Sequence, residues 1–173
     1  MMYFYHGMPN PMIGTKLIPL NRMPISMCDI RALHLSKYVG REEILKRRVP
    51  LLNCLWNDVV QLLPLHPRKI FEKQVNLGLL NEMPEYAFFQ IDVRTLDPDI
   101  TVVYFKNAPG EESVVVKWLR DVDLNSLQEV PPATTHYYES LVGLNEPPFN
   151  YQFVPHILHM GEIDVTHATR ITI

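Results

Sequence analysis

Hydrophobic residues recur in short blocks separated by proline-containing turns, a pattern typical of strands and loops rather than long helices. The blocks are rich in β-branched and aromatic residues and have the length of strands. The expected strands cover residues 3–7, 16–18, 59–63, 86–93, 100–105, 114–119, 153–160, 163–165 and 171–173. Turns between them are short, as at residues 107–112 around Pro109 and Gly110, which favours antiparallel hairpins.

Helical spacing is clearest at residues 68–80, where Phe71, Val75 and Leu79 fall on one face. Pro67 suits the first turn of this helix. A second, shorter helix is expected within residues 26–38, with its cap near Ser26 or Asp29.

Three less regular segments complete the pattern. Residues 40–49 mix both charges and predict a solvated helix with internal ion pairs. Alternatively, Arg41, Arg47 or Arg48 could hold the pyrophosphate of a ligand. Residues 124–130 predict a helical turn, and residues 134–143 a loop that runs into a strand.

Composition indicates one folded domain across residues 1–173. Hydrophobic residues make up 47% of the 173 residues and charged residues 20%, enough apolar material for a core. The fold class expected is α+β, with mostly antiparallel sheets and one or two flanking helices. The formal net charge is -3 with mixed signs, which does not favour binding to a phosphate backbone.

No stretch approaches the about 18 apolar residues of a membrane span, and no export signal of the usual kind is visible. We therefore expect a soluble protein without a membrane partner, either cytoplasmic or delivered as an effector without an export signal. His156 and His159 have a spacing that a helix could use for a metal, but no cysteine or carboxylate pair completes the site. We expect no metal.

Two residues have positions that suggest chemistry. His6 ends an aromatic strand just before Gly7, where its ring could point into a cleft. Glu139 follows Tyr138 directly before an apolar segment, where a carboxylate is either solvated or held for use. Taken singly, each residue also has an ordinary structural explanation, as a hydrogen-bonded histidine and a solvated strand end.

Short motifs at the two ends of the chain resemble those of one enzyme family. Phe-Tyr-His-Gly at residues 4–7, followed by Ile-Gly-Thr-Lys-Leu-Ile-Pro at residues 13–19, resembles the opening of ADP-ribosyltransferases, closest to the rifamycin-modifying group. Tyr-Glu-Ser-Leu-Val at residues 138–142 resembles the glutamate-led strand of the poly-ADP-ribose polymerase-like members. The resemblance implies a split two-sheet fold with a cleft.

The same resemblance implies NAD as substrate, with transfer of ADP-ribose to an acceptor and release of nicotinamide. His6 would hydrogen-bond a ribose hydroxyl, and Gly7 would let the backbone approach the nicotinamide amide. Glu139 would be the catalytic residue, since its carboxylate stabilises the oxocarbenium-like charge of the transition state. Tyr5 and Tyr138, which flank these residues, are expected in the NAD site as well.

One position departs from the family pattern. Gln61 falls where the family has a tyrosine that stacks on nicotinamide, and its side chain cannot stack in that way. Either Tyr38, Trp56 or Tyr137 supplies the ring, or the activity is altered or lost.

Two other functions remain open at this point. A non-enzymatic interaction module on the same scaffold could recruit a partner by strand addition. A hydrolase or phosphotransferase would need several histidines to converge, namely His66, His136, His156 and His159. The acceptor of a transferase could be a protein, a nucleic acid or a small molecule, and neither its identity nor the oligomeric state follows from the sequence.

Overall fold

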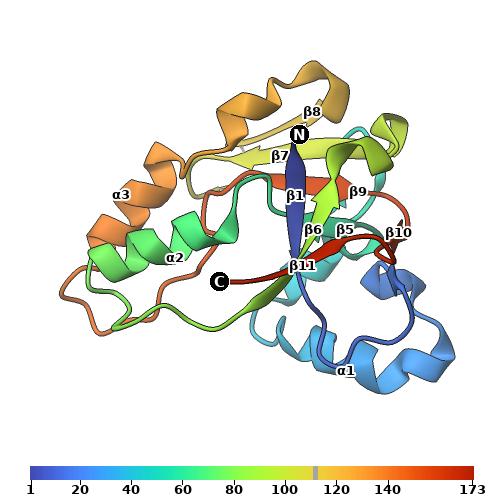
Figure 1. Cartoon of the computed structure of the whole chain (residues 1–173), viewed down its shortest axis with the longest axis horizontal. Helices are drawn as coiled ribbons and strands as arrows, with labels where there is room; N and C mark the ends of the chain where they lie inside the picture. Colours follow the sequence, from blue (N-terminus) through green and yellow to red (C-terminus); the bar gives the residue numbers. More distant parts are fainter. Residues whose placement is uncertain (111–112) are drawn as a thin grey trace.

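The computed structural model covers residues 1–173 and describes all of them except residues 111 and 112. It shows a mixed α+β fold in which antiparallel sheets are flanked by helices (Figure 1). The helices of the described residues are α1 (Cys28–Ser36), α2 (Pro67–Asn76) and α3 (Pro132–Leu141). The predicted α+β class with antiparallel sheets is confirmed, with one helix more than expected.

Two sheets form the body of the molecule. The larger has the order β5 (Val60–Leu62), β9 (His156–His159), β7 (Thr101–Lys106) and β8 (Val114–Trp118). The smaller has β6 (Ala87–Asp92) at its centre, between β1 (Tyr3–Gly7) and β11 (Thr169–Thr172). All pairs are antiparallel. Two short pairs join β2 (Lys16–Leu17) to β10 (Ile163–Asp164), and β3 (Arg48–Val49) to β4 (Cys54–Leu55).

The two sheets touch through β1 and β5. The Tyr5 amide donates to the Leu63 carbonyl at 2.9 Å, and the Leu63 amide donates back to Tyr5 at 2.8 Å. Within the described residues no other backbone hydrogen bond joins these two strands. The backbones of the two sheets are therefore hydrogen-bonded at this one bridge, although their side chains also pack in a shared core cluster. Strand β1 continues past the bridge for two residues.

The alternation predicted for β1 places its side chains in different cores. Phe4 is fully buried in a cluster with Leu62 of β5, on one side of the strand. Tyr5 is buried in a second cluster with Ile70 and Phe71 of α2. The predicted helix at residues 68–80 is confirmed in its start at a proline and in the burial of Phe71, but it ends at Asn76. Its buried face is Ile70, Phe71 and Gln74 rather than the predicted line through Val75 and Leu79.

The prediction of a loop and strand at residues 134–143 is wrong, because this segment is helix α3. Its buried residues Thr134, Tyr138 and Leu141 recur at the helical spacing, and Pro132 occupies the first turn, where its missing N–H costs nothing. The charged segment at 40–49 is not an α-helix: it forms the short 3-10 helix Glu42–Lys46, followed by strand β3. The turn predicted at 107–112 includes residues 111 and 112, which lie outside the described residues.

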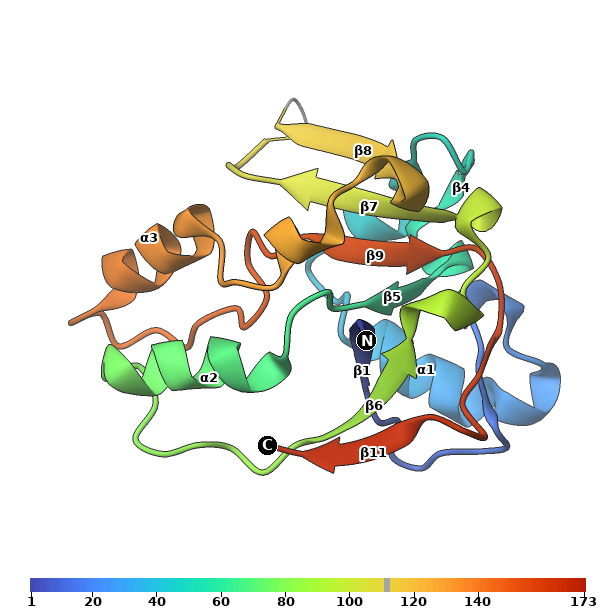
Figure 2. The ribbon, with the colours of Figure 1, turned by 45° about the horizontal axis from the view of Figure 1, so that its top comes forward.

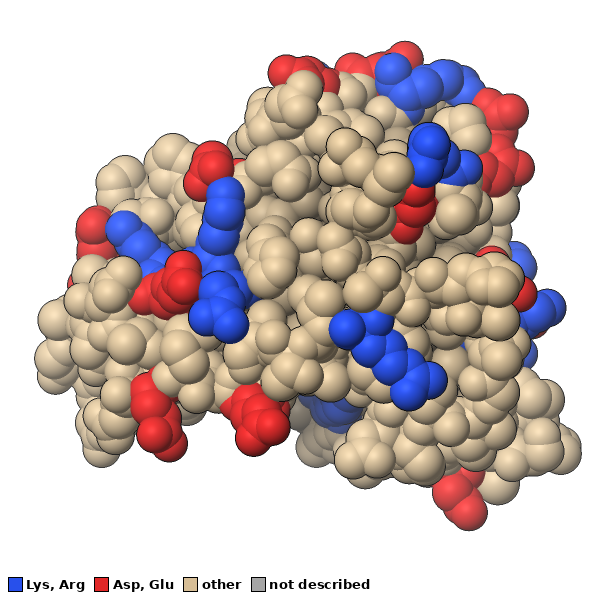
Figure 3. Space-filling view, in the orientation of Figure 1, with Lys and Arg blue, Asp and Glu red and all other residues tan. Residues whose placement is uncertain are grey.

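In the described part of the chain, none of the helices is both long and apolar enough to cross a membrane. On the face shown in Figure 3, Lys and Arg side chains lie scattered among Asp and Glu rather than gathered into one basic surface. This distribution agrees with the mixed signs of charge in the sequence.

Candidate functional site

His6 lies at the end of β1, just past the bridge that joins the two sheets. Its Nδ1 is 2.6 Å from the Gly7 carbonyl oxygen. Because a carbonyl only accepts, we assign the imidazole proton to Nδ1, which leaves Nε2 as an acceptor. Burial, together with the nearby His34 and Lys37, lowers the pKa of His6 to about 4, against the opposing effect of the Gly7 carbonyl. His6 is therefore neutral at neutral pH.

The C-terminal end of α1 lies near His6, because His34 and Lys37 are close enough to affect its pKa. Met27, Ile30, His34 and Tyr38 are half-buried and recur at helical spacing, so they form the inner face of this segment. The Lys37 ammonium donates to His34 Nδ1 at 3.2 Å, so His34 presents Nε2–H as its other ring group when neutral. Burial, and then the charge of Lys37, lowers the pKa of His34.

Tyr38 connects α1 to the start of β5. Its hydroxyl donates to Oδ1 of the buried Asn57 at 3.1 Å. Burial raises the pKa of Tyr38, while Arg41, a hydrogen bond with Gln61 and a contact with Trp56 oppose that rise. The Gln61 amide also donates to the Trp56 carbonyl at 3.4 Å. Gln61 thus lies beside an aromatic ring that comes from another part of the chain.

Two arginines border this group of side chains. The Arg47 guanidinium lies 5.5 Å from the Trp56 ring centroid, and that of Arg41 lies 5.5 Å from the Phe149 ring centroid. Arg48 instead donates to Asn53 at 2.9 Å. Two of the three arginines considered for a pyrophosphate therefore lie near these rings: Arg41 near Tyr38, and Arg47 over Trp56.

The structure does not bring Glu139 to His6. Glu139 is exposed on α3, and α3 lies beside α2, away from α1, in both Figures 1 and 2. No side-chain hydrogen bond or ion pair of Glu139 occurs among the residues that the structure describes. The carboxylate that the resemblance pairs with His6 therefore faces solvent elsewhere.

Tyr5 and Tyr138 are core residues rather than part of an open site. The Tyr138 side chain is fully buried, and its hydroxyl donates to the Asn150 carbonyl. Tyr5 packs edge-on against the His66 ring, with 5.0 Å between their centroids. These contacts do not place the Tyr5 or the Tyr138 ring beside His6, Gln61 and Tyr38.

The other histidines have separate local partners. His66 Nδ1 accepts from the Arg68 amide at 3.3 Å at the start of α2, and His159 Nδ1 lies 2.8 Å from the Thr101 hydroxyl. His156 bonds the Val154 carbonyl at 2.8 Å, and His136 is exposed on α3. Apart from His136, for which the described structure shows no side-chain hydrogen bond, each of these histidines has its own local partner, which argues against a shared catalytic centre. Across the described residues there is no cluster of three or more His, Cys, Asp or Glu that could hold a metal.

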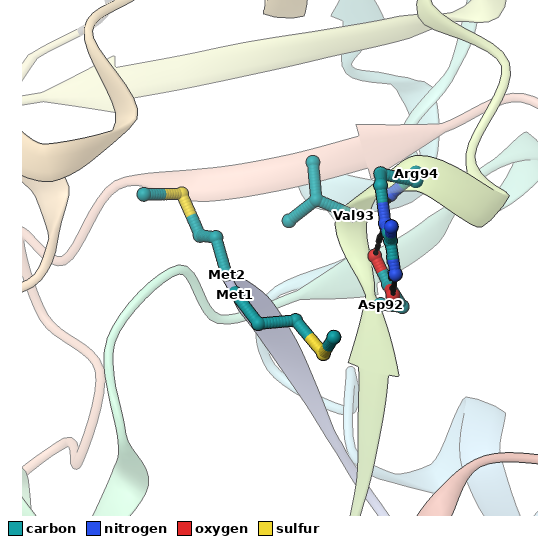
Figure 4. A pocket seen from close by; sticks show the side chains of 5 residues that line it. All are labelled: Met1, Met2, Asp92, Val93 and Arg94. Atoms are coloured by element: carbon teal, nitrogen blue, oxygen red, sulfur yellow. Dashed lines mark hydrogen bonds and ion pairs between the residues drawn. The ribbon is translucent and has the colours of Figure 1, made fainter.

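Two surface hollows lie away from His6. The first, of about 470 Å³, is lined by Met1, Met2, Asp92, Val93 and Arg94 (Figure 4). It lies at the far end of β1, because Tyr3 pairs with Asp92 whereas His6 pairs with Phe89. The second, of about 330 Å³, lies between α2 and α3 beside the ion pair of Lys69 and Glu129. Neither is lined by a predicted site residue.

Sequence reasoning identified His6 and Gln61, and it named Tyr38 as one of three possible replacement rings. It missed His34, Lys37 and Asn57. The sequence does indicate one helical face here, because Met27, Ile30, His34 and Tyr38 recur at helical spacing. However, no local pattern predicts which strand or loop this face packs against.

Comparison of the chain with protein-family models, with curated proteins and with solved structures finds no match. The arrangement around His6 is therefore the basis for any functional inference.

Proposed function

We propose that this protein binds NAD beside His6 and transfers ADP-ribose from it to an acceptor, with release of nicotinamide. The observation that carries the proposal is the convergence of the end of β1, β5 with the adjoining Leu63, and the end of α1. His6 Nε2 would accept a hydrogen bond from a hydroxyl of the nicotinamide ribose. A neutral imidazole suits this role because the protonated ring has no acceptor.

Tyr38 supports the nicotinamide half of the proposal. Its ring stands next to Gln61, the position where the resembled family has its stacking tyrosine. Tyr38 would offer the aromatic face, and Gln61 an amide that can pair with the carboxamide of nicotinamide. Arg41 and Arg47, which border these rings, would face the diphosphate.

The split two-sheet arrangement of the resembled family also belongs to this proposal. The two antiparallel sheets joined at one bridge, with His6 just beyond it, support that assignment.

Binding is tested by isothermal titration of the full chain with NAD, and chemistry by chromatographic detection of free nicotinamide. His6→Ala removes the ribose acceptor and should weaken NAD binding by about tenfold, the effect of one lost hydrogen bond. His136→Ala on α3 is the matched control and should bind NAD as the unaltered protein does. Equal binding by both variants, or no binding at all, would contradict the proposal.

A second function, a non-enzymatic interaction module, is favoured by one observation. No carboxylate in the described part of the chain hydrogen-bonds to His6, Tyr38 or Gln61, although transfer from NAD needs stabilisation of positive charge. The nicotinamide measurement separates the two functions. NAD binding without any nicotinamide release, whatever acceptor is added, would support the module.

A further inference from the structure

Residues 20–48, here named the α1 segment, are attached to the molecule in an unusual way. They contain α1 together with the 3-10 helices Leu20–Arg22, Ile25–Met27 and Glu42–Lys46. Pro19 and Val49 are buried at either end, yet no residue between them is buried. Since burial of apolar surface is the main force that holds an element to a core, this segment is held weakly.

The ends of the α1 segment are firmly anchored. On one side, buried Leu17 of β2 pairs with Ile163 of β10. On the other, fully buried Val49 of β3 pairs with Cys54 of β4. These pairs provide two fixed points from which the intervening residues can move.

Between these anchors the attachment is mainly polar. In the described chain, two backbone hydrogen bonds outside the regular strands join the segment to other residues, both close to its ends: the Arg22 amide donates to the Pro19 carbonyl, and the Trp56 amide donates to the Arg47 carbonyl. Asn21 Nδ2 donates to Asp58 Oδ1 at 2.9 Å, and the Tyr38 hydroxyl donates to Asn57. Arg41 contacts the exposed Phe149 ring, and Arg47 lies over the Trp56 ring. Half-buried Ile44 makes the apolar contact of the segment, against the cluster that contains Val49 and Trp56.

We propose that the α1 segment is a lid that swings away from His6 and closes over a bound ligand. That the ligand is a nicotinamide nucleotide rests on the proposed function, whereas the movement itself does not. Opening withdraws His34 and Lys37 from the end of β1, moves Tyr38 away from Asn57 and Gln61, and exposes the His6 ring. Closing restores the hydrogen bond of Tyr38 with Asn57, which acts as the latch.

The outer surface of the lid agrees with this movement. Ile25 is 93% exposed and Leu33 is 56% exposed, so neither side chain gains or loses much burial when the lid opens. The inner face is only half-buried in the closed state. Opening therefore exposes less apolar surface than the release of a helix with buried core residues would, and the polar attachments contribute to the balance.

Hydrogen exchange of the full chain without ligand, read by mass spectrometry, tests the lid. Amides of α1 should exchange faster than those of β7 and β9, which exchange only on wider unfolding. Tyr38→Phe removes the latch and should speed exchange of α1 by about twofold to fivefold, the effect of one lost hydrogen bond, with β7 and β9 still slower than α1. Tyr86→Phe, a half-exposed tyrosine outside the segment, is the matched control and should change nothing in α1.

Two results would overturn the lid: exchange of α1 as slow as that of β7 and β9, or equal effects of Tyr38→Phe and Tyr86→Phe on α1. A second arm with saturating NAD separates this inference from the proposed function. Slower exchange of α1 with NAD supports both. A mobile α1 segment that NAD leaves unchanged keeps the lid and counts against NAD as its ligand.

Discussion

Helices α1 and α2 have 9 and 10 residues, and they are attached to the rest of the chain in opposite ways. Helix α2 buries Ile70, Phe71 and Gln74 against the core, whereas α1 buries no side chain. Helix α2 also begins at Pro67, with the His66 side chain accepting the Arg68 amide, while α1 lacks a side-chain cap. The contrast indicates that α2 is part of the framework and α1 is an attachment near His6.

The largest expected loss of stability comes from truncating a buried side chain of α2. Phe71→Ala should lower the free energy of unfolding by about 3–5 kcal/mol, because a fully buried ring is replaced by a cavity. Leu33→Ala on α1 should change it by less than about 0.5 kcal/mol, since that side chain is 56% exposed. Urea unfolding of both variants measures the difference, and similar losses would abolish the contrast between the helices.

The next largest effect is the dependence of stability on pH that arises from protonation of His6. Because the native pKa of about 4 lies below the usual value near 6.5, the unfolded chain binds a proton in this interval while the native protein does not. Stability should therefore fall as the pH drops from about 6.5 to 4, by on the order of 1–3 kcal/mol from this residue.

His6→Gln tests that effect, because it removes the titrating ring. The variant should lose less stability than the unaltered protein between pH 6.5 and 4, as measured by urea unfolding at a series of pH values. Identical pH profiles would show that His6 is not shielded from solvent in the native protein. His136→Gln, at an exposed position on α3, serves as the control.

A smaller effect is expected at the latch of the lid. Tyr38→Phe should lower the free energy of unfolding by about 0.5–1 kcal/mol, because Asn57 loses one hydrogen-bond donor. Thermal unfolding checks this value. A loss as large as that of Phe71→Ala would mean that α1 is integrated into the core, as α2 is.

The smallest effect is expected at Glu139. Glu139→Gln should leave stability within about 0.5 kcal/mol and should not alter NAD binding, because the side chain is exposed and lacks partners in the described structure. Titration with NAD and thermal unfolding measure the two quantities. Loss of NAD binding would show that α3 contributes to the site after all.

The same helices show how far the sequence could predict the fold. Helix α2 was readable because Phe71 and Val75 recur at helical spacing against polar neighbours. Strand lengths were readable because Pro and Gly mark the turns. Helix α3 was misread because Tyr137 and Tyr138 favour strands locally, and the pairing of Thr134 with Tyr138 on one face was overlooked.

The site was less predictable than the fold. The position of His6 before Gly7 is local information, so the sequence could reveal it. The approach of Tyr38 to Gln61 and Asn57 depends on how the segment before β3 folds back, which no local pattern specifies. The pairing of His6 with Glu139 failed for the same reason, because it needed the wrong secondary structure at residue 139.

The central position of β6 has a consequence for the order in which the chain folds. Its two partners, β1 and β11, come from opposite ends of the sequence, and β9 likewise pairs with the distant β5 and β7. In the two sheets, β7 and β8 alone pair as neighbours along the described chain. Bringing such distant strands together costs conformational entropy before their contacts can stabilise the pairing, so we expect folding to be slow. We expect it to begin at the β7–β8 hairpin and at α2, where the contacts are local. The end of β1, with His6, would be among the last parts to be assembled.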